Sequence, residues 1–361
     1  MKQIIFAFNH LQYADGVARS AIGMANALAA RQDVKVILRP LFKVNKTVSD
    51  LLHPRVTVKP LLGFYVSGLS KLLHFLPRTV LYQLIFGRQA DVAIGFQYGI
   101  ATRAVVGGRR LPGTKRYVWM HGYDEGLHMK ADYLMADKVM CVSRHNAERL
   151  FAELKGKVPV YPCYNLVDDK EIYQQAEQPN DLMRPNTSLF VTVGRLSLEK
   201  GFDRLIQVFG RLRDEGHAFH FWLIGDGPER EKLEALINRL SLSEQVTLLG
   251  EQSNPHQFTS RADVFVCSSF AEGYNTACYE ASILGIPLVS TDVSGAHEIV
   301  QDAQAGLVVP NDEVGLYQGL KQLLSRPELV VQWKKTLEST RKNFYYETRV
   351  AQLYRVLELE D

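Results

Sequence analysis

The chain has 361 residues, of which 46% are hydrophobic and 22% are charged, a composition typical of a folded globular protein. This length exceeds the size at which one hydrophobic core keeps growing, so two domains are expected. No segment has the roughly 18 uncharged apolar residues that a membrane-spanning helix needs. The N-terminus becomes polar too soon for a signal peptide. Four scattered cysteines without a Cys-x-x-Cys pair favour buried thiols in a reducing cytoplasm over disulfides or a zinc site.

Charge is distributed unevenly along the chain. Residues 1–168 contain 23 Lys and Arg against 11 Asp and Glu, a net charge of +12, whereas the remainder contains 19 against 28, a net charge of −9. The densest basic stretch, residues 53–116, has ten basic side chains and a single acid, Asp91. This asymmetry predicts that the first half faces an anionic partner. Nucleic acid is not expected to be that partner, because the aromatic residues here lie among aliphatic ones rather than among the cations.

Short β-rich runs alternate with helical patterns from one end of the chain to the other. The predicted strands are residues 4–8, 34–38, 92–96, 117–120, 139–142 and 158–161, then 189–193, 219–224, 246–249, 264–267, 287–290 and 306–309. Such alternation predicts an α/β protein with two doubly wound parallel sheets, each covered by helices on both faces. The polar segment 164–187, which contains Pro179 and Pro185, is the predicted linker.

In doubly wound sheets, ligands bind at the carboxyl ends of the strands. The residues that stand out in such positions are Gly16, His121, Ser143, Arg195, Gly225 and Glu272. Gly16 lacks a side chain and permits close approach to a ligand. His121 has the alternative of a hydrogen-bonded structural histidine, and Ser143 that of a helix cap.

A basic turn follows the predicted strand 189–193. Gly194 permits a tight turn, and Arg195 and Lys200 flank the start of a helix, where anions are already favoured. A diphosphate would fit there, although a solvated turn with surface cations remains an alternative. Gly225 begins a Gly-x-Gly-Pro run at the end of another strand, where two glycines alone favour a plain turn over a ligand site.

Residues 272–280 are the most specific feature of the sequence. A helix is expected to begin at Asn275 or Thr276, both good N-caps. The backbone amides expected to point at an anion are those of Gly273, Tyr274, Asn275 and Thr276. Glu280 lies one turn further on the same face, so Glu272 and Glu280 are predicted to bind sugar hydroxyls on either side of a diphosphate. The alternative is a helix with two surface glutamates.

Three motifs are absent from the sequence. Without Asp-x-Asp, no acidic clamp for a divalent metal is expected, and the basic turn has to neutralise a leaving group. Without Gly-x-Gly-x-x-Gly after the first strand, a dinucleotide oxidoreductase is not indicated. Without Gly-x-x-x-x-Gly-Lys-Ser/Thr, a P-loop NTPase is excluded.

Taken together, these residues resemble the group 1 (family 4) retaining glycosyltransferases of the GT-B fold, with two Rossmann-like domains facing across a cleft. The resemblance covers essentially the whole chain and is strongest in residues 193–309, through Gly-Arg-x4-Lys-Gly at 194–201 and Glu-x7-Glu at 272–280. It implies an acceptor-side domain at 1–165 and a nucleotide-sugar domain at 166–343. It also implies that the helical pattern at 344–361 crosses back onto the first domain.

The same resemblance implies roles for individual residues. Arg195 and Lys200 bind the donor diphosphate, Glu280 holds the ribose hydroxyls, and Glu272 holds those of the donor sugar. The amides of Gly16 and of residues 273–276 contact phosphate or sugar, and His121 sits beside the reacting centre.

The resemblance predicts a metal-independent retaining transfer of a hexose-type sugar from a nucleoside-diphosphate sugar, with UDP expected, and no cofactor. The expected acceptor is a saccharide or lipid-linked glycan in bacterial surface-glycan synthesis, such as lipopolysaccharide, capsule or exopolysaccharide. A GT-B sugar-nucleotide epimerase, a phosphorylase and a non-catalytic nucleotide-sugar-binding protein remain alternatives.

An anionic membrane surface is the further predicted partner. The apolar stripe consists of Leu69, Leu72, Leu73 and Leu76, continued by Val80, Leu81, Leu84 and Ile85, and is flanked by Lys71, Arg78 and Arg88. An apolar face with basic flanks is typical of a helix lying in the lipid interface, which predicts a cytoplasmic protein bound peripherally to the inner membrane. The alternative is that the stripe packs on the sheet of its own domain.

Overall fold

The computed structural model describes residues 1–11, 16–87, 90–110, 112–122 and 128–360. The chain forms two compact units. Unit 1 contains Met1–Leu166 and Arg349–Asp361, and unit 2 contains Val167–Thr348. The sequence predicts the boundaries after residue 165 and before residue 344.

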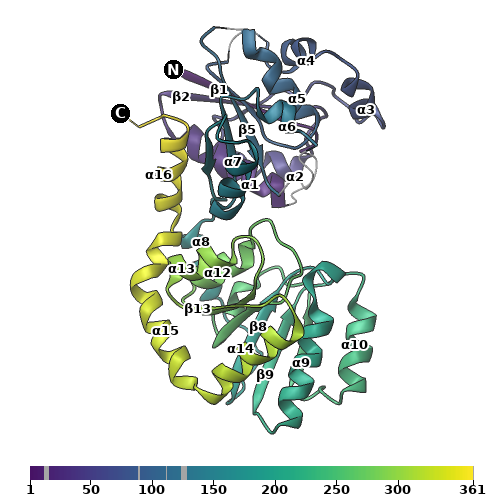
Figure 1. Cartoon of the computed structure of the whole chain (residues 1–361), viewed down its shortest axis with the longest axis vertical. Coiled ribbons are helices and arrows are strands. Elements are labelled where there is room, and N and C mark those ends of the chain that lie inside the picture. Colours follow the sequence, from purple (N-terminus) through teal and green to yellow (C-terminus); the bar gives the residue numbers. More distant parts are fainter. Residues whose placement is uncertain (12–15, 88–89, 111, 123–127, 361) are drawn as a thin grey trace. The chain divides into compact units, whose positions relative to one another are not determined.

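Unit 1 is built on a parallel seven-stranded sheet (Figure 1). Its strands are β1 (Lys2–Phe8), β2 (Val34–Pro40), β3 (Thr57–Val58), β4 (Val92–Gly95), β5 (Lys115–Met120), β6 (Lys138–Cys141) and β7 (Val160–Pro162). Their order in the sheet is β3-β2-β1-β4-β5-β6-β7. Successive side chains of the central strands β1 and β4 are buried on both faces, so helices cover both sides of the sheet.

The helices of unit 1 connect these strands and cover the two faces of the sheet. They are α1 (Gly16–Ala30), α2 (Lys46–Ser49), α3 (Leu69–His74), α4 (Arg78–Ile85), α5 (Ile100–Val106), α6 (Lys130–Tyr133) and α7 (Arg144–Glu153), with the 3-10 turn η1 (Gly107–Arg110). Helix α16 (Tyr346–Val356) begins with the last residues of unit 2 and belongs to unit 1 from Arg349 onward. The hydroxyl of Ser143 accepts a hydrogen bond from the Asn146 amide at 3.2 Å, so the helix-cap interpretation of Ser143 is confirmed. The Tyr354 hydroxyl of α16 donates to the Ala27 carbonyl of α1 at 2.9 Å.

Unit 2 is built on a parallel six-stranded sheet. Its strands are β8 (Ser188–Val193), β9 (Phe219–Ile224), β10 (Val246–Gly250), β11 (Val264–Cys267), β12 (Leu288–Thr291) and β13 (Gly306–Val309), in the order β10-β9-β8-β11-β12-β13. All twelve strands predicted from the sequence are present in the two units. The short β3 was not predicted, because two residues carry no alternation pattern.

The helices of unit 2 alternate with its strands. They are α8 (Asp169–Ala176), α9 (Phe202–Asp214), α10 (Arg230–Arg239), α11 (His256–Thr259), α12 (Thr276–Ile283), α13 (Ala296–Ala303), α14 (Glu313–Ser325) and α15 (Pro327–Thr340), with the 3-10 turns η2 (Leu198–Lys200) and η3 (Arg341–Phe344). Helix α8 lies inside the segment predicted as a linker. It forms because Asp168 caps the amides of Lys170 and Glu171, and because Ile172 is buried.

Both sheets have the strand order of a doubly wound Rossmann sheet, which confirms the predicted fold class. In each sheet the order reverses where two central strands pair, β1 with β4 in unit 1 and β8 with β11 in unit 2. Within each pair, the loops that follow the two strands leave their carboxyl ends in opposite directions. The space between the loops is where such folds bind ligands.

The apolar stripe predicted to lie on a membrane is divided between the inside and the outside of unit 1. Three of its side chains belong to the core: Leu73, Leu81 and Ile85. Three others are exposed: Leu72, Val80 and Leu84. The prediction of one continuous lipid-facing stripe is therefore wrong, because α3 and α4 use part of it to pack on their own sheet. None of the described helices is long and apolar enough to span a membrane.

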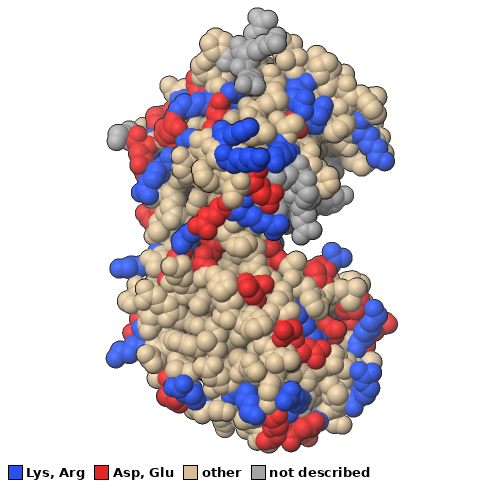
Figure 2. Space-filling view, viewed as in Figure 1, with Lys and Arg blue, Asp and Glu red and all other residues tan. Residues whose placement is uncertain are grey.

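Several basic side chains of unit 1 are paired with acidic ones. On the face seen in Figure 2, its Lys and Arg side chains stand in separate groups, several beside acidic ones. Arg78 Nε donates to Asp132 Oδ1 at 2.5 Å, so this predicted membrane-facing cation is neutralised within the unit. Lys115 pairs with Glu358, and Arg116 with Asp137. Arg88 lies outside the described residues.

Candidate functional site

The candidate site of unit 2 begins in the loop that follows β8. Leu196 is fully buried and anchors this loop, which ends in the 3-10 turn η2 and Gly201. Gly201 has φ +62°, and a Cβ at this position would lie 2.4 Å from the Ser268 carbonyl oxygen. A glycine is therefore required here, because the loops after β8 and β11 pass in direct contact.

A second glycine fixes the other side of the same loop. Gly225 has φ +141°, and a Cβ there would lie 1.9 Å from the Gly194 carbonyl oxygen. The Gly194 amide also donates to the Ile224 carbonyl at 3.0 Å. The Gly-x-Gly-Pro run thus lets two loops pack closely at the carboxyl edge of the sheet, which accounts for Gly225 without a ligand.

The loop after β11 leads into helix α12, whose first residue is Thr276. Asn275 is the N-cap, as predicted, and its side-chain oxygen accepts from the Cys278 amide at 3.2 Å. Ser294 Oγ donates to the Gly273 carbonyl at 3.0 Å and so fixes the chain just before the helix. Tyr274 is buried, and its ring lies under Gly295.

Lys200 and Glu272 meet across the point where the strand order of unit 2 reverses. Lys200 Nζ lies 2.7 Å from Glu272 Oε1. The same carboxylate oxygen accepts from Ser269 Oγ at 2.6 Å and from Asn275 Nδ2 at 3.0 Å. Three donors therefore converge on Oε1, and Oε2 of Glu272 has no hydrogen-bond partner among the described residues.

The ion pair is largely shielded from water. The side chain of Lys200 is 23% exposed and that of Glu272 is 11% exposed. Burial by itself lowers the pKa of Lys200, but the charge and hydrogen bond of Glu272 outweigh it, so the pKa ends above its usual value. Lys200 is therefore cationic at neutral pH, and two of its three ammonium donors remain for a ligand.

Arg204 positions this loop and was not predicted from the sequence. Its guanidinium on α9 donates to the carbonyls of Ser268 and Ser269 and to the side-chain oxygen of Asn311, at 2.5 to 3.0 Å. It also stacks on Phe270, with 3.8 Å from Cζ to the ring centroid. An arginine within an amphipathic helix resembles a surface cation in the sequence, so only the fold reveals this role.

Two buried thiols adjoin the cluster. Asn275 Nδ2 lies 3.3 Å from Cys267 Sγ. The hydrogen bond from Cys278 lowers the pKa of Cys267 and leaves the proton on Cys278, whose pKa is raised. Both thiols are buried, as the sequence predicts, and they pack beneath the site rather than facing solvent.

Two further residues of unit 2, Arg195 and Glu280, were predicted to bind the donor. Arg195 is exposed and has no side-chain partner in the described part of the chain. Glu280 is half-buried on α12, one turn beyond Thr276. The structure thus brings Lys200, Glu272 and Asn275 into direct hydrogen-bond contact. It shows no such contact of Arg195 or Glu280 with these three residues among the side-chain hydrogen bonds that it describes. No group of three or more His, Cys, Asp or Glu placed as metal ligands occurs among the described residues.

In unit 1, His121 lies at the carboxyl end of β5. Its Nε2 is 3.0 Å from the Phe96 carbonyl oxygen, and its ring packs against those of Phe96 and Trp119, at 4.5 and 6.4 Å between centroids. His121 therefore makes the structural hydrogen bond that the sequence offered as an alternative to a ligand-binding role. His121 also lines a hollow of about 550 Å³ together with Asn9, His10, Gln97 and Tyr98, so a ligand can still reach it.

Gly16 is the first residue of α1 and is exposed. A Cβ at Gly16 would meet no described atom within 4 Å, so packing does not demand a glycine there. The neighbouring Val17 lines the His121 hollow. Asp15, which precedes Gly16, lies outside the described residues.

Comparison with known proteins identifies relatives of this chain. A family model described as glycosyl transferases group 1 matches residues 174–340. The N-acetylgalactosamine-N,N'-diacetylbacillosaminyl-diphospho-undecaprenol 4-alpha-N-acetylgalactosaminyltransferase of Campylobacter jejuni is 31% identical over 217 residues, which are 59% of this chain and 57% of that protein. The chain spans about half the length of the curated relatives that it matches in this way.

Two solved structures share the whole fold. Anabaena Alr3699/HepE, solved in complex with UDP, has a TM-score of 0.75 at 18% identity and covers 99% of this chain and 100% of its own. The lipopolysaccharide outer core galactosyltransferase WaaB, in its apo form, has a TM-score of 0.74 at 18% identity, with 99% of both chains covered. At this identity the likeness shows the fold alone, which is that of the GT-B glycosyltransferases.

Proposed function

We propose that this chain, whose residues 174–340 belong to the group 1 glycosyl transferases, transfers a sugar from a nucleoside-diphosphate donor to a glycan acceptor. The observation that carries the proposal is the Lys200–Glu272 pair at the strand reversal of unit 2. A cation with spare donors and a carboxylate with one unoccupied oxygen face the same ligand-binding edge of the sheet. Phosphate and sugar hydroxyls are the groups that such a pair recognises.

In the proposed complex, unit 2 binds the diphosphate of the donor with cations and backbone amides, and binds the hydroxyls of its sugar and ribose with carboxylates. Lys200 and Arg195, with the amides that begin α12, neutralise the diphosphate. Glu272 Oε2 accepts a hydroxyl of the donor sugar, while Lys200, Ser269 and Asn275 hold Oε1 in place. Glu280 accepts the ribose hydroxyls. Because the three donors on Oε1 are already in position, binding needs little rearrangement of the carboxylate.

The proposed reaction is a retaining substitution without metal. The bond between the anomeric carbon and the diphosphate oxygen breaks, and its electron pair passes to the diphosphate, which Lys200 and Arg195 stabilise. The acceptor hydroxyl then bonds to the anomeric carbon on the same face, and its proton passes to a phosphate oxygen. No protein base is needed, and one nucleoside diphosphate leaves for each sugar transferred.

A UDP-hexose is the proposed donor, and a surface glycan or its lipid-linked precursor is the proposed acceptor. Support comes from the solved relatives, one of which binds UDP and one of which is a galactosyltransferase of the lipopolysaccharide outer core. The name of the Campylobacter jejuni relative gives a diphospho-undecaprenol-linked saccharide as its acceptor.

A hydrolysis screen tests the function. The full chain is incubated with a panel of nucleotide sugars, with and without candidate acceptors, and release of nucleoside diphosphate is measured together with the anomeric configuration of the product. We expect slow release from UDP-hexoses that accelerates with acceptor. Interconversion of sugars without transfer would indicate an epimerase, phosphate-dependent cleavage a phosphorylase, and donor binding without turnover a binding protein.

We also propose that unit 1 docks on an anionic membrane surface through an apolar patch formed by Phe64, Leu72, Phe75, Val80 and Leu84. Phe75 is 84% exposed, and Phe64 and Leu72 are 67% and 68% exposed. The exposed Lys71 directly precedes Leu72 in the chain and has no partner in the described part of the chain. Apolar side chains beside an unpaired cation fit lipid tails and anionic head groups.

Sedimentation with liposomes tests this docking. Binding should require anionic lipid, weaken as salt rises, and fall when Phe75→Ser is combined with Lys71→Glu. Arg78→Glu is not a clean probe, because it breaks the pair with Asp132. Equal binding to neutral and anionic vesicles, or to neither, would contradict the proposal.

A further inference from the structure

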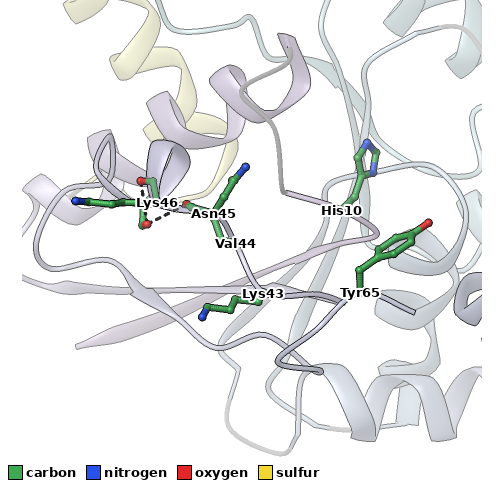
Figure 3. A pocket seen from close by; sticks show the side chains of 7 residues that line it. His10, Lys43, Val44, Asn45, Lys46 and Tyr65 are labelled. Atoms are coloured by element: carbon green, nitrogen blue, oxygen red, sulfur yellow. Dashed lines mark hydrogen bonds between the residues drawn. The ribbon is translucent and has the colours of Figure 1, made fainter. Parts of the chain in front are cut away.

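A second hollow of unit 1, of about 990 Å³, lies where loops follow β1 and β2. It is lined by His10, Lys43, Val44, Asn45, Lys46, Ser49 and Tyr65, and none of these residues is acidic. In Figure 3, Lys43, Asn45 and Lys46 lie on one side of the hollow, and His10 and Tyr65 lie on the other. Both lysines line this space, which is large enough for a sugar ring and its substituents, and in Figure 3 their ammonium ends point away from His10 and Tyr65.

The segment after β2 is built to present these side chains. Phe42 and Val44 are buried, so the residues between and after them, Lys43 and Asn45, project outward. The turn at α2 is closed by Ser49 Oγ, which donates to the carbonyls of Asn45 and Lys46 at 3.0 and 3.1 Å. Lys46 thus begins a hydrogen-bonded turn, and Lys43 lies three positions before it, between the buried Phe42 and Val44.

The charges of Lys43 and Lys46 are not used inside the protein. Neither side chain makes an ion pair or hydrogen bond in the described part of the chain. Other cations of unit 1 do have acidic partners: Arg78 with Asp132, Arg116 with Asp137, and Lys115 and Lys138 with Glu358. Two unpaired cations lining one hollow produce a local positive potential that favours an anionic ligand.

This hollow adjoins the one that His121 lines, because His10 belongs to both. The Gln97 side chain holds the segment in place: Oε1 accepts from the Asn9 and His10 amides at 2.8 and 3.1 Å, and Nε2 donates to the His10 carbonyl at 3.1 Å. The two hollows therefore meet at the strand reversal of unit 1, beside a rigidly held residue.

Tyr65 offers a surface for the ring of a sugar. Its own ring packs on buried Phe42, with 4.9 Å between centroids, yet the residue is 63% exposed. An aromatic face that is fixed on one side and open on the other is suited to the apolar face of a sugar ring. Tyr65 also follows Phe64 of the apolar patch directly in the chain.

We propose that the acceptor is an anionic glycan, whose phosphate or carboxylate group binds Lys43 and Lys46 while the attached sugar lies across Tyr65 and His10 toward His121. This inference rests on the proposed function and specifies its acceptor class. The unit 1 hollow then selects the acceptor by charge, independently of the donor site in unit 2. The anionic group belongs either to the saccharide itself or to a lipid diphosphate that carries it.

The test compares transfer by the full chain to four matched acceptors: a neutral hexose glycoside, its 6-phosphate, the hexuronic acid glycoside, and a short polyprenyl-diphosphate-linked N-acetylhexosamine. The variant is Lys43→Gln combined with Lys46→Gln. The matched control is Lys155→Gln combined with Lys157→Gln, two exposed lysines of the same unit. The dissociation constant for UDP and the thermal unfolding temperature of each variant establish that the fold is intact.

We expect kcat/KM for the preferred anionic acceptor to fall about tenfold or more in the Lys43 and Lys46 variant, since two charge-assisted contacts are lost. The small activity on the neutral glycoside should not fall with it, and the control variant should resemble wild type. The phosphate, uronic acid and lipid arms identify the source of the anion.

Equal losses on neutral and anionic acceptors, or no loss on either, would overturn the inference while leaving the glycosyltransferase function standing. So would a wild-type enzyme that prefers the neutral glycoside. Absence of nucleoside diphosphate release from every nucleotide sugar, with or without acceptor, would instead contradict the proposed function itself.

Discussion

The two units share a strand order, but the lysines of their two candidate sites are held differently. Unit 2 belongs to the acidic half of the chain, and there Lys200 of the candidate site is fixed against Glu272, which also accepts from Ser269 and Asn275. Unit 1 belongs to the basic half, and there Lys43 and Lys46 line a hollow and have no acidic partner among the described residues. Net charge alone therefore does not locate a ligand, whereas the pairing of individual charges does.

The difference corresponds to two kinds of task. A leaving group that gains charge during reaction is best stabilised by groups held rigidly in advance, which is the role proposed for the cluster of unit 2. A substrate that arrives from solution with its charge already present is attracted by unpaired cations on an open surface, which is the role proposed for the hollow of unit 1. The comparison can be tested one unit at a time.

The largest effect is expected at the cluster of unit 2. Lys200→Ala and Arg195→Ala should each lower kcat by roughly a hundredfold or more, because each removes a group that stabilises the departing diphosphate. Lys200→Ala should also lower the unfolding temperature, since it leaves the shielded Glu272 carboxylate without its counter-charge. Steady-state kinetics and thermal unfolding are the measurements.

A matched control for these variants is Lys232→Ala, a surface cation of the same unit whose side chain is 71% exposed and pairs with Glu229. It should resemble wild type in both measurements, because exposed pairs contribute little to stability. Near-wild-type turnover in a well-folded Lys200→Ala enzyme would refute the assignment of the diphosphate site.

The fold could be predicted from the sequence because strand and helix periods are local properties. The runs at 219–224, 264–267 and 306–309 coincide with β9, β11 and β13, since buried parallel strands have continuous apolar sequences. The sequence could not show which residues of the apolar stripe are buried and which are exposed. An apolar helix face has the same pattern whether it packs on a sheet or faces solvent. Only packing separates Leu73 from Leu72.

Part of the site could also be predicted. The N-cap at Asn275 follows from side-chain chemistry alone, and the positions of Lys200 and Glu272 follow from the rule that ligand loops leave the carboxyl ends of strands. The Lys200–Glu272 contact, 72 residues apart in sequence, could not be deduced without the strand order. Arg204 and the Lys43–Lys46 hollow were missed for the same reason, since each depends on segments distant in sequence.

A smaller effect, on donor binding rather than on turnover, is expected at Glu280. Glu280→Ala should weaken donor binding about tenfold while changing kcat little, because ribose hydroxyls alter little between ground and transition states. Titration calorimetry with UDP and the separation of kcat from KM measure this. A loss confined to kcat would place Glu280 at the reacting centre instead of the ribose.

Acid should weaken unit 2 through His256. Burial lowers the pKa of His256 to about 4 from its usual 6.5, so the unfolded chain binds this proton more readily than the folded one. The stability contributed by neutral His256 is present above pH 6.5 and is lost as pH falls toward 4. The loss is on the order of 2 kcal/mol at about pH 4.5.

Thermal unfolding of wild type and His256→Gln at about pH 7 and about pH 4.5 measures this loss. The wild-type unfolding temperature should fall further with acid than that of the variant. His297→Gln, which replaces an exposed histidine whose side chain is 72% accessible, should follow wild type. Parallel acid profiles for wild type and His256→Gln would show that this histidine does not couple stability to pH.

The smallest expected effect, no change at all, concerns metal. If Lys200, Arg195 and the amides at the start of α12 neutralise the diphosphate, a divalent cation has no task at the donor site. Transfer by the full chain should then be equal in excess chelator, in added Mg²⁺ and in added Mn²⁺, after correction for nucleotide–metal binding.

The sharper experiment repeats this with Lys200→Ala, whose residual activity should rise when Mg²⁺ supplies the missing positive charge. Complete loss of wild-type activity in chelator, restored by either metal, would mean that unit 2 does not provide the counter-charge by itself. The contrast drawn between a preorganised unit 2 and an open, unpaired unit 1 would then fail.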